Sequence, residues 1–504
     1  MQTQKLNTKR IILVGFAFFL ISAFWQAYDA IVPLVLTNHF GLNQFFSGAV
    51  MSLDNILALF MLPLFGAISD KFNSRFGKRT PFIFIGTIVA IVAFILLTFI
   101  DNAQLAPVFE STITESYAEA STLRDAAYDI MKEGRKLDNP ELIEKAEMML
   151  KNADELFEQI RLETLAITKQ NALYFIGFIG TLLLLLIAMA TFRSPAVALM
   201  PDVTIKPLRS KGNAVINLMG TAGGILVLLL GKILHTSEIY MQYTWYVVAV
   251  CAIMLIGLLI FIFTVKENKW AKEMQEETER LNIARTGDAE PEEKRKLTKA
   301  EKQSLILILA SVALWYIGYN SITSKYSVYA SNELGFDYNL TLIIAQAAAV
   351  VAYIPVGIVS SKFGRRKTIL AGIVMLASAF LLGNFITPAI PESLMYPIFI
   401  LAGIGWATIN VNSFPMVVEL ARGGEVGKYT GYYYTASMAA QIVAPVLSGL
   451  LYDIFTMRVT FFLFGTVFVA SSFLTMFFVR HGNAQDLGGK TAKELISDNF
   501  ANDD

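Results

Sequence analysis

Residues 66–86 read GAISDKFNSRFGKRTPFIFIG, in which a charged cluster lies between two apolar segments. The charged residues of the cluster are Asp70, Lys71, Arg75, Lys78 and Arg79. Lys and Arg gather in the short loops on the cytoplasmic side of membrane proteins. The stretch therefore predicts a short cytoplasmic loop that joins two membrane-spanning helices.

The composition agrees with a membrane protein. Of 504 residues, 55% are hydrophobic and 16% are charged, whereas soluble domains carry about 25% charged residues. Lys plus Arg and Asp plus Glu number 41 each, so net charge gives no reason to expect a nucleic-acid partner. The lone cysteine, Cys251, can form neither an internal disulfide nor a cysteine metal site.

Twelve segments are apolar over about the 20 residues that a membrane-crossing helix needs. Lipid offers no partner to free backbone groups, so each segment must be helical. The predicted fold class is an all-α membrane protein, with twelve transmembrane helices in two six-helix, pseudo-symmetric bundles. The predicted spans are residues 11–36, 47–69, 80–100, 171–192, 213–234, 243–265, 304–330, 338–360, 368–387, 394–418, 429–452 and 459–479.

Lys and Arg also predict the orientation. They occur near the N-terminus and in alternate loops, whereas residues 37–46, 235–242 and 388–393 contain none. We therefore expect both termini in the cytoplasm and a multi-pass protein of the cell membrane. The predicted units are an N-terminal six-helix bundle (1–265), a cytoplasmic linker (266–303), a C-terminal six-helix bundle (304–480) and a cytoplasmic tail (481–504).

Residues 101–170 fall on the external side and form an insertion in the first bundle. Asn139 and Pro140 have the residue types of a helix start. Apolar residues then repeat at gaps of four and three, as on one face of a helix: Leu142, Ala146, Met149, Ala153, Leu156 and Ile160. We expect an external helical hairpin, which is either a spacer without a ligand or a receptor element.

The opening motif has a counterpart in the second half. GIVSSKFGRR, residues 357–366, follows the second span of that half, just as the opening stretch follows the second span of the first half. Elements repeated in two halves are typical of duplicated transporters. The pattern resembles the loop of the major facilitator superfamily, G-x-x-x-D-[RK]-x-G-[RK]-[RK]. Ser361 replaces the usual Asp in the second copy, and four extra residues interrupt the first copy.

The longer form, SDKFNSRFGKRTPFI, resembles a narrower family, the glycoside–pentoside–hexuronide:cation symporters and the related sucrose transporters. PDVTIKPLRSKGNAVINLMG at 201–220 resembles the same family, and GIGWATINVNSFPMVVEL at 403–420 is similar to its sucrose-transporter-like branch. The resemblance implies a sugar as substrate and a cation as coupling ion.

Charged residues at the cytoplasmic helix ends form a predicted gate. A cation and a carboxylate on neighbouring helix ends can pair only while the helices are close, so such pairs would favour the outward-open state. Glu419 is the expected partner of Arg365 or Arg366. The alternative is that these charges only set the orientation. The predicted gate residues are Gly66, Asp70, Lys71, Arg75, Gly77, Lys78, Arg79, Arg365, Arg366 and Glu419.

Two acids inside spans, Asp29 and Asp54, are the predicted cation-coupling residues. An ionisable residue inside a span costs at least about 2.5 kcal/mol and is a functional candidate. A buried carboxylate can load a proton on one side of the membrane and release it on the other. Melibiose-type members of the family carry extra carboxylates on helices two and four, but residues 171–192 contain no acid. We therefore favour a proton as coupling ion, and sodium stays open as the alternative.

Sugar recognition needs flat apolar faces for C–H surfaces, together with amides or carboxylates for hydroxyls. The spans supply both, although Trp and Tyr also belong to membrane-interface belts. Lys325, near the end of the seventh span, is expected to reach the external surface, and the alternative is a gating partnership with an acid. The predicted substrate-binding residues are Trp25, Tyr28, Asn55, Asn213, Asn217, Trp315, Tyr319, Asn320, Gln346, Trp406, Asn410, Tyr434 and Gln441.

Three functions stay open. The leading one is a secondary active transporter, a proton-coupled symporter of a glycoside or disaccharide. No G-x-x-x-x-G-K-[ST] motif for ATP is present, so the energy for transport must come from an ion gradient. The others are a proton-coupled exporter of drugs or metabolites and a non-transporting membrane sensor. We expect no enzyme, cofactor or metal site, since His39, His235 and His481 are scattered. The expected partners are a small-molecule substrate and the lipid bilayer, with the chain as a monomer.

Overall fold

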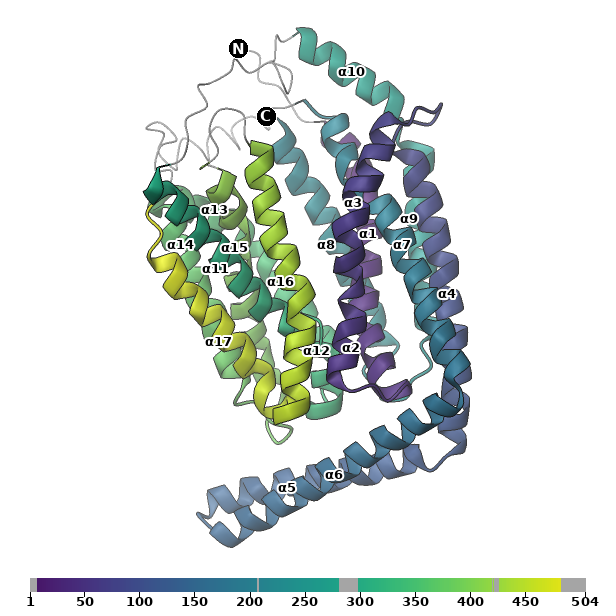
Figure 1. The fold of residues 1–504 in the computed structure, drawn as a ribbon, viewed down its shortest axis with the longest axis vertical. Coiled ribbons are helices and arrows are strands. Elements are labelled where there is room, and N and C mark those ends of the chain that lie inside the picture. The colour runs from purple at the N-terminus through teal and green to yellow at the C-terminus, as the bar shows by residue number, and fades with distance from the viewer. Residues whose placement is uncertain (1–6, 206–207, 281–297, 419, 421–425, 482–504) are drawn as a thin grey trace.

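The structure is a computed structural model and describes residues 7–205, 208–280, 298–418, 420 and 426–481. Every regular element in these ranges is a helix. Twelve of the helices are long and apolar enough to cross a membrane. They stand side by side in two bundles (Figure 1), which confirms the predicted fold class.

The helices of the first half are interrupted at two places, one near Pro33 and one at Ser52. The first helix ends at Leu34, one residue after Pro33, and passes into a π-helical turn at Val35; proline removes a backbone donor from the helix. The second span is divided at Ser52, whose hydroxyl donates to the carbonyl groups of Gly48 and Ile442, at 2.9 Å each. The elements are α1 (Thr8–Leu34), η1 (Val35–His39), α2 (Gln44–Met51), α3 (Leu53–Lys71), α4 (Thr80–Glu110), α5 (Ile113–Lys136), α6 (Pro140–Gln170), α7 (Ala172–Asp202), α8 (Arg209–Ile233) and α9 (Thr244–Thr264).

A linking helix, α10 (Glu267–Arg280), follows the first half. The second half begins with a capping box, in which Thr298 and Glu301 bond each other's backbone. Its elements are α11 (Lys299–Thr323), α12 (Tyr326–Val328), η3 (Tyr329–Leu334), α13 (Tyr338–Phe363), α14 (Arg365–Gly383), η4 (Glu392–Leu394), α15 (Met395–Val418), α16 (Val426–Phe455) and α17 (Met457–Phe477).

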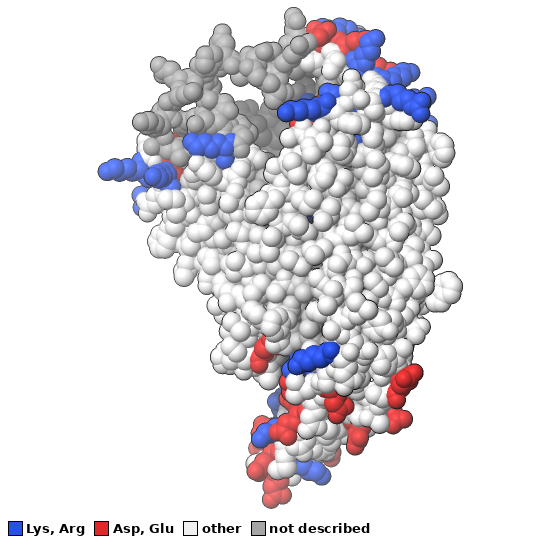
Figure 2. Space-filling model, turned by 45° about the vertical axis from the view of Figure 1, so that its right-hand side comes forward, with Lys and Arg blue, Asp and Glu red and all other residues white. Residues whose placement is uncertain are grey.

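The molecule has two distinct ends. We call the end where α1 begins and α17 ends the terminal end, and the opposite end, which carries α5 and α6, the hairpin end (Figure 1). Charged side chains gather at both ends, with an uncharged band between them (Figure 2). Large apolar side chains such as Phe60 and Val92 are 69% and 61% exposed. Such a band is what lipid tails require, so the chain is a multi-pass membrane protein.

The two halves are joined near the hairpin end. The Asp453 carboxylate on α16 accepts from the backbone N–H groups of Gln44 and Phe45 at the start of α2, at 2.9 Å each. Gly48 lies so close to α16 that a Cβ there would come within 2.1 Å of the Pro445 oxygen. These contacts seal the seam between α2 and α16 at that end.

The position of Lys325 differs from its prediction. Its side chain is fully buried, and Nζ donates to Gln44 Oε1 at 3.1 Å. The prediction was wrong because α2 of the other half covers this residue, and no local pattern in the sequence shows such a contact.

Two spans are longer than predicted. The helix α4 continues to Glu110 and α7 continues to Asp202, about ten residues beyond the predicted ends in each case. The longer helices place Asp101 inside α4 and Arg193 inside α7.

Candidate functional site

A cavity of about 180 Å³ lies inside the protein between the two halves. The first half contributes residues of α1, α2, α3 and α7, and the second half contributes residues of α11 and α16. The lining residues are Trp25, Asp29, Met51, Asp54, Asn55, Arg193, Asn320, Thr323, Ser324, Gln441 and Pro445.

Three charged residues face this cavity, and all belong to the first half. They are Asp29 on α1, Asp54 on α3 and Arg193 on α7. The guanidinium carbon of Arg193 lies 5.5 Å from the centroid of the Trp25 ring, within the range of a cation–π attraction. Asp54 Oδ1 accepts from the backbone and side-chain N–H groups of Asn55, at 2.6 and 2.7 Å.

These charges give the cavity its chemistry. Among the described residues the lining holds two carboxylates and one guanidinium, and Arg193 interacts electrostatically with both acids. Ionisable residues in a membrane protein usually mark an ion or substrate path. One of the carboxylates can take up a proton and still leave the other to balance Arg193.

The remaining polar lining is neutral and comes mostly from the second half. Asn320, Thr323, Ser324 and Gln441 offer amide and hydroxyl groups opposite the charged residues. A few polar groups that converge on a concave site fix the orientation of a small ligand. The cavity therefore suits a small polar solute.

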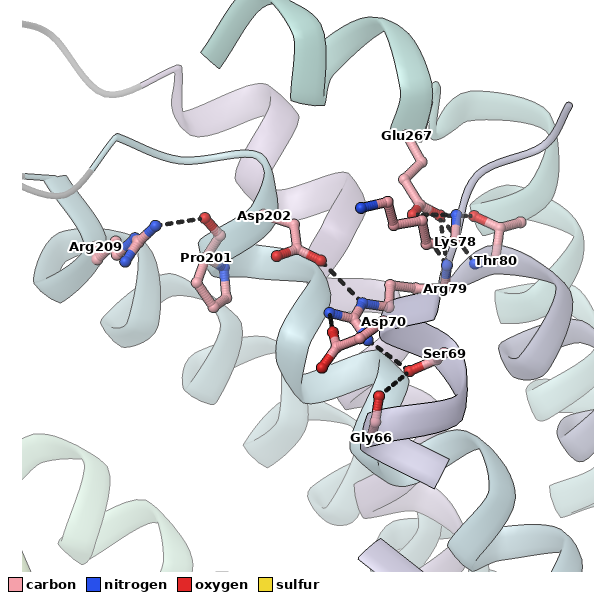
Figure 3. Close-up of polar contacts among 10 residues, drawn as sticks. All are labelled: Gly66, Ser69, Asp70, Lys78, Arg79, Thr80, Pro201, Asp202, Arg209 and Glu267. Atoms are coloured by element: carbon pink, nitrogen blue, oxygen red, sulfur yellow. Dashed lines mark hydrogen bonds and ion pairs between the residues drawn. The ribbon is translucent and has the colours of Figure 1, made fainter. Parts of the chain in front are cut away.

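A second cluster of charges lies at the terminal end, around the buried side chain of Arg79 (Figure 3). Its guanidinium donates to Asp202 at 2.9 Å, to Asp70 at 2.5 Å and to Ser69 at 2.5 Å. Burial lowers the pKa of Arg79, but Asp202 and Asp70 outweigh burial and raise that pKa above its ordinary value. The cluster joins α3, the start of α4 and the end of α7.

The start of α4 is capped by a residue of the linking helix. The Glu267 carboxylate on α10 accepts from the backbone N–H groups of Lys78, Arg79 and Thr80 at 2.7 to 2.9 Å. It also accepts from the Thr80 hydroxyl at 2.8 Å (Figure 3). A carboxylate there satisfies donors that a helix start leaves free and complements the helix dipole. It ties α10 to α4.

A protein-family comparison identifies the chain. The family model described as Major Facilitator Superfamily matches residues 164–352 and 338–499, which is more than half of the sequence. The chain belongs to the major facilitator superfamily. A second model, described as MFS/sugar transport protein, matches residues 13–113, which include the opening motif.

Solved transporters share the fold of this superfamily member. The inward-open xylose transporter XylE from E. coli is 13% identical, with a TM-score of 0.62 over 97% of this chain and 99% of that chain. A D-xylose-proton symporter is 14% identical, with a TM-score of 0.59 over 96% and 99%. The nucleoside transporter NupG is 14% identical, with a TM-score of 0.53 over 94% and 100%. At such identities the likeness concerns the fold.

The structure brings part of the predicted set together. Trp25, Asp29, Asp54, Asn55, Asn320 and Gln441 all line the cavity. Tyr28 and Trp315 are instead fully buried outside it. The rings of Tyr319 and Trp406 stack on each other, with centroids 3.7 Å apart and planes 5° apart. One face of the Trp406 ring is thus covered by protein rather than free for a sugar.

The other predicted binding residues lie outside the cavity lining. Asn213 and Asn217 on α8 and Tyr434 on α16 are exposed, and Asn410 on α15 is half-buried. Gln346 on α13 donates to Gln26 on α1 and so joins the two halves.

The predicted gate residues divide into two groups. Gly66, Asp70, Gly77 and Arg79 lie in or directly against the cluster at the terminal end, whereas Lys71, Arg75 and the Lys78 side chain are exposed. Glu419 lies outside the described residues, so its pairing with Arg365 or Arg366 stays a prediction. Arg366 donates to the backbone oxygen of Phe477.

Three residues with clear contacts were missed from the sequence. Arg193 and Asp202 lie beyond the predicted end of the fourth span, because the charges themselves lowered the local hydropathy. The internal repeat offered a signal for Asp202. This acid stands at the end of the fourth apolar segment of the first half, and Glu419 stands at the corresponding place in the sequence of the second half. No comparable signal exists for Glu267, whose role depends on where α10 packs.

A buried pair near the hairpin end was also missed. His39 Nδ1 lies 2.6 Å from Asp101 Oδ1, and both side chains are almost fully buried. The rings of Tyr240 and Tyr243 stack against the imidazole, with centroids 6.4 and 5.6 Å away. Asp101 directly follows the predicted end of the third span, so the sequence placed it in the external insertion, residues 101–170.

Proposed function

We propose that this protein is a proton-coupled symporter that carries a glycoside or disaccharide through the central cavity. The observation that carries the proposal is the placement of Asp29, Asp54 and Arg193 in one cavity between two halves, opposite neutral hydrogen-bonding groups. The match of residues 13–113 to the sugar transport model supports a sugar. The motif at 66–86 in turn resembles that of the glycoside–pentoside–hexuronide:cation branch.

The mechanism follows from the charges in the cavity. A proton binds to Asp29 or Asp54 while the cavity faces outward, and this leaves one carboxylate to balance Arg193. A site without net charge is more easily closed off from water inside the apolar protein while the halves rock. When the cavity faces the cytoplasm, the sugar and then the proton depart.

The orientation and the conformation belong to the same proposal. With both termini in the cytoplasm of a cell, the hairpin end is external. The contacts of Asp453 with α2 then close the cavity toward the outside. The Arg79 cluster connects helices of the first half only, so we assign it to holding α3, α4 and α7 together as one unit during rocking.

Uptake by proteoliposomes tests this function. The purified protein is offered mono- and disaccharides, with a proton gradient and a sodium gradient applied separately. We expect accumulation of a sugar under an inward proton gradient alone. Accumulation under sodium alone would assign sodium as the coupling ion. Accumulation only in inverted vesicles would indicate an exporter, and no accumulation under any gradient would favour a sensor.

Two substitutions in α11 separate cavity residues from buried residues. Asn320→Ala removes a polar group from the lining, and a lost hydrogen bond of about 1–1.5 kcal/mol raises the KM for sugar roughly fivefold to tenfold. Trp315→Phe changes a residue that is fully buried outside the cavity. It should lower the melting temperature and leave KM unchanged. Equal KM effects would contradict the placement of the binding site.

A further inference from the structure

The hairpin of α5 and α6 is rooted in the first half. It continues from α4 and leads into α7, and its base has an apolar cluster of its own. Leu105, Val108, Ile113 and Ile160 are buried there with Tyr240, which comes from the loop before α9. The hairpin is therefore fixed to the first half and should move with it.

Further along, the same hairpin contacts the second half. Asp154 on α6 forms an ion pair with Arg458 at the start of α17. Arg124 on α5 donates to the backbone oxygen of Asn332 in η3. The hairpin runs beneath the second half at the lower end of the molecule (Figure 1). It thus spans the seam between the halves.

The contact is more than an exposed ion pair. Arg458 also lies 3.7 Å from Glu333, and its guanidinium is 5.8 Å from the ring of Tyr128 on α5. The side chains of Arg458 and Arg124 are only 21% and 6% exposed. Partial burial strengthens such pairs relative to pairs in water. The cation of the second half is therefore held by residues from both helices of the hairpin.

We propose that the hairpin is a latch that holds the hairpin end closed. The base of the hairpin is fixed to the first half, and residues further along the hairpin bind Arg458 and Asn332 of the second half. The contacts with Arg458 and Asn332 must therefore break whenever the halves separate at this end. The latch rests on the alternating access of the proposed function, but not on which solute or ion is carried.

Spin-label distances across the terminal end test the latch directly. Ketone-bearing unnatural residues at the exposed positions Asn73 and Lys367 carry the labels, one in each half. Arg458→Gln removes the pairs with Asp154 and Glu333. In this variant the fraction of short label-to-label distances, which marks opening at the hairpin end, should rise about twofold to fivefold, because the ion pair between Arg458 and Asp154 across the halves is lost.

A matched control lies on the same hairpin. Arg135, in the last turn of α5, is exposed, and among the described residues it forms no hydrogen bond or ion pair with the second half. Arg135→Gln should leave the distances unchanged. An unchanged distribution in Arg458→Gln and also in Asp154→Asn would overturn the latch.

A reversible cross-link gives a second, independent test. In a Cys251→Ser background, Asp154→Cys and Arg458→Cys are joined by a bis-thiosulfonate linker. Short distances should disappear, and a reductant should bring them back. The pair Glu147→Cys and Lys151→Cys, exposed and linked within α6, is the control without effect. If short distances between the two labels persist while positions 154 and 458 are linked, the latch is refuted. Because no substrate is present, a wrong sugar or ion assignment cannot produce this result.

Discussion

Asp29→Asn is expected to abolish the accumulation of sugar against its gradient while sugar exchange continues. Asparagine keeps the size of the side chain and some of its hydrogen bonds, but it cannot bind a proton at physiological pH. The neutral lining groups, Asn320 and Gln441 among them, are unchanged and can still hold the solute. In proteoliposomes with an inward proton gradient, the internal sugar concentration should reach the external value and rise no further. Counterflow with preloaded sugar should persist.

The same measurement on Asp54→Asn assigns the proton. If one variant accumulates sugar and the other does not, the inactive variant identifies the proton carrier. A loss in both variants would mean that the two carboxylates act as a coupled pair. Normal accumulation in both variants would show that the coupling assignment is wrong.

A third acid provides the matched control. Asp101 is also buried inside a span of the first half, but it pairs with His39 and does not line the central cavity. Asp101→Asn should lower the melting temperature and keep proton-driven accumulation. Loss of coupling in this variant at normal stability would place the proton path elsewhere.

The sequence predicted the fold because the bilayer leaves few choices. Length and apolarity identify spans when every span must be a helix of about 20 residues. Trp25 and Asp29 are four residues apart and so lie on one helix face, and both residues line the cavity. Charges inside apolar segments were informative for the same reason, since lipid makes them costly.

The failures have two physical causes. A span that is apolar on all sides does not show which face meets the cavity. The burial of Trp315 and the stacking of Trp406 on Tyr319 could therefore not be foreseen. Contacts between halves join residues far apart in the sequence, as with Lys325 and Gln44. These depend on packing that one sequence does not reveal.

Gly77→Ala is expected to destabilise the terminal end of the first half strongly. Gly77 has φ +121°, a conformation that L side chains rarely adopt. A Cβ at this position would also lie 2.1 Å from Glu267 Oε2. The carboxylate that caps α4 would have to move away and leave the backbone N–H groups of Lys78, Arg79 and Thr80 without their acceptor. Strain of about 1–3 kcal/mol and a lost cap of about 1 kcal/mol together predict a clear drop in melting temperature in detergent.

Two further variants separate the strain from the cap. Gly335 also has a positive φ, +69°, but no described atom lies within 4 Å of a Cβ there, so Gly335→Ala measures strain with little steric conflict. Its melting temperature should fall less than that of Gly77→Ala. Glu267→Ala removes the cap without strain, so its effect and that of Gly77→Ala should be less than additive in the double variant, because both remove the same hydrogen bonds. Fully additive effects would show that Gly77 and Glu267 act separately, and the tie between α10 and the start of α4 would then be unimportant for stability.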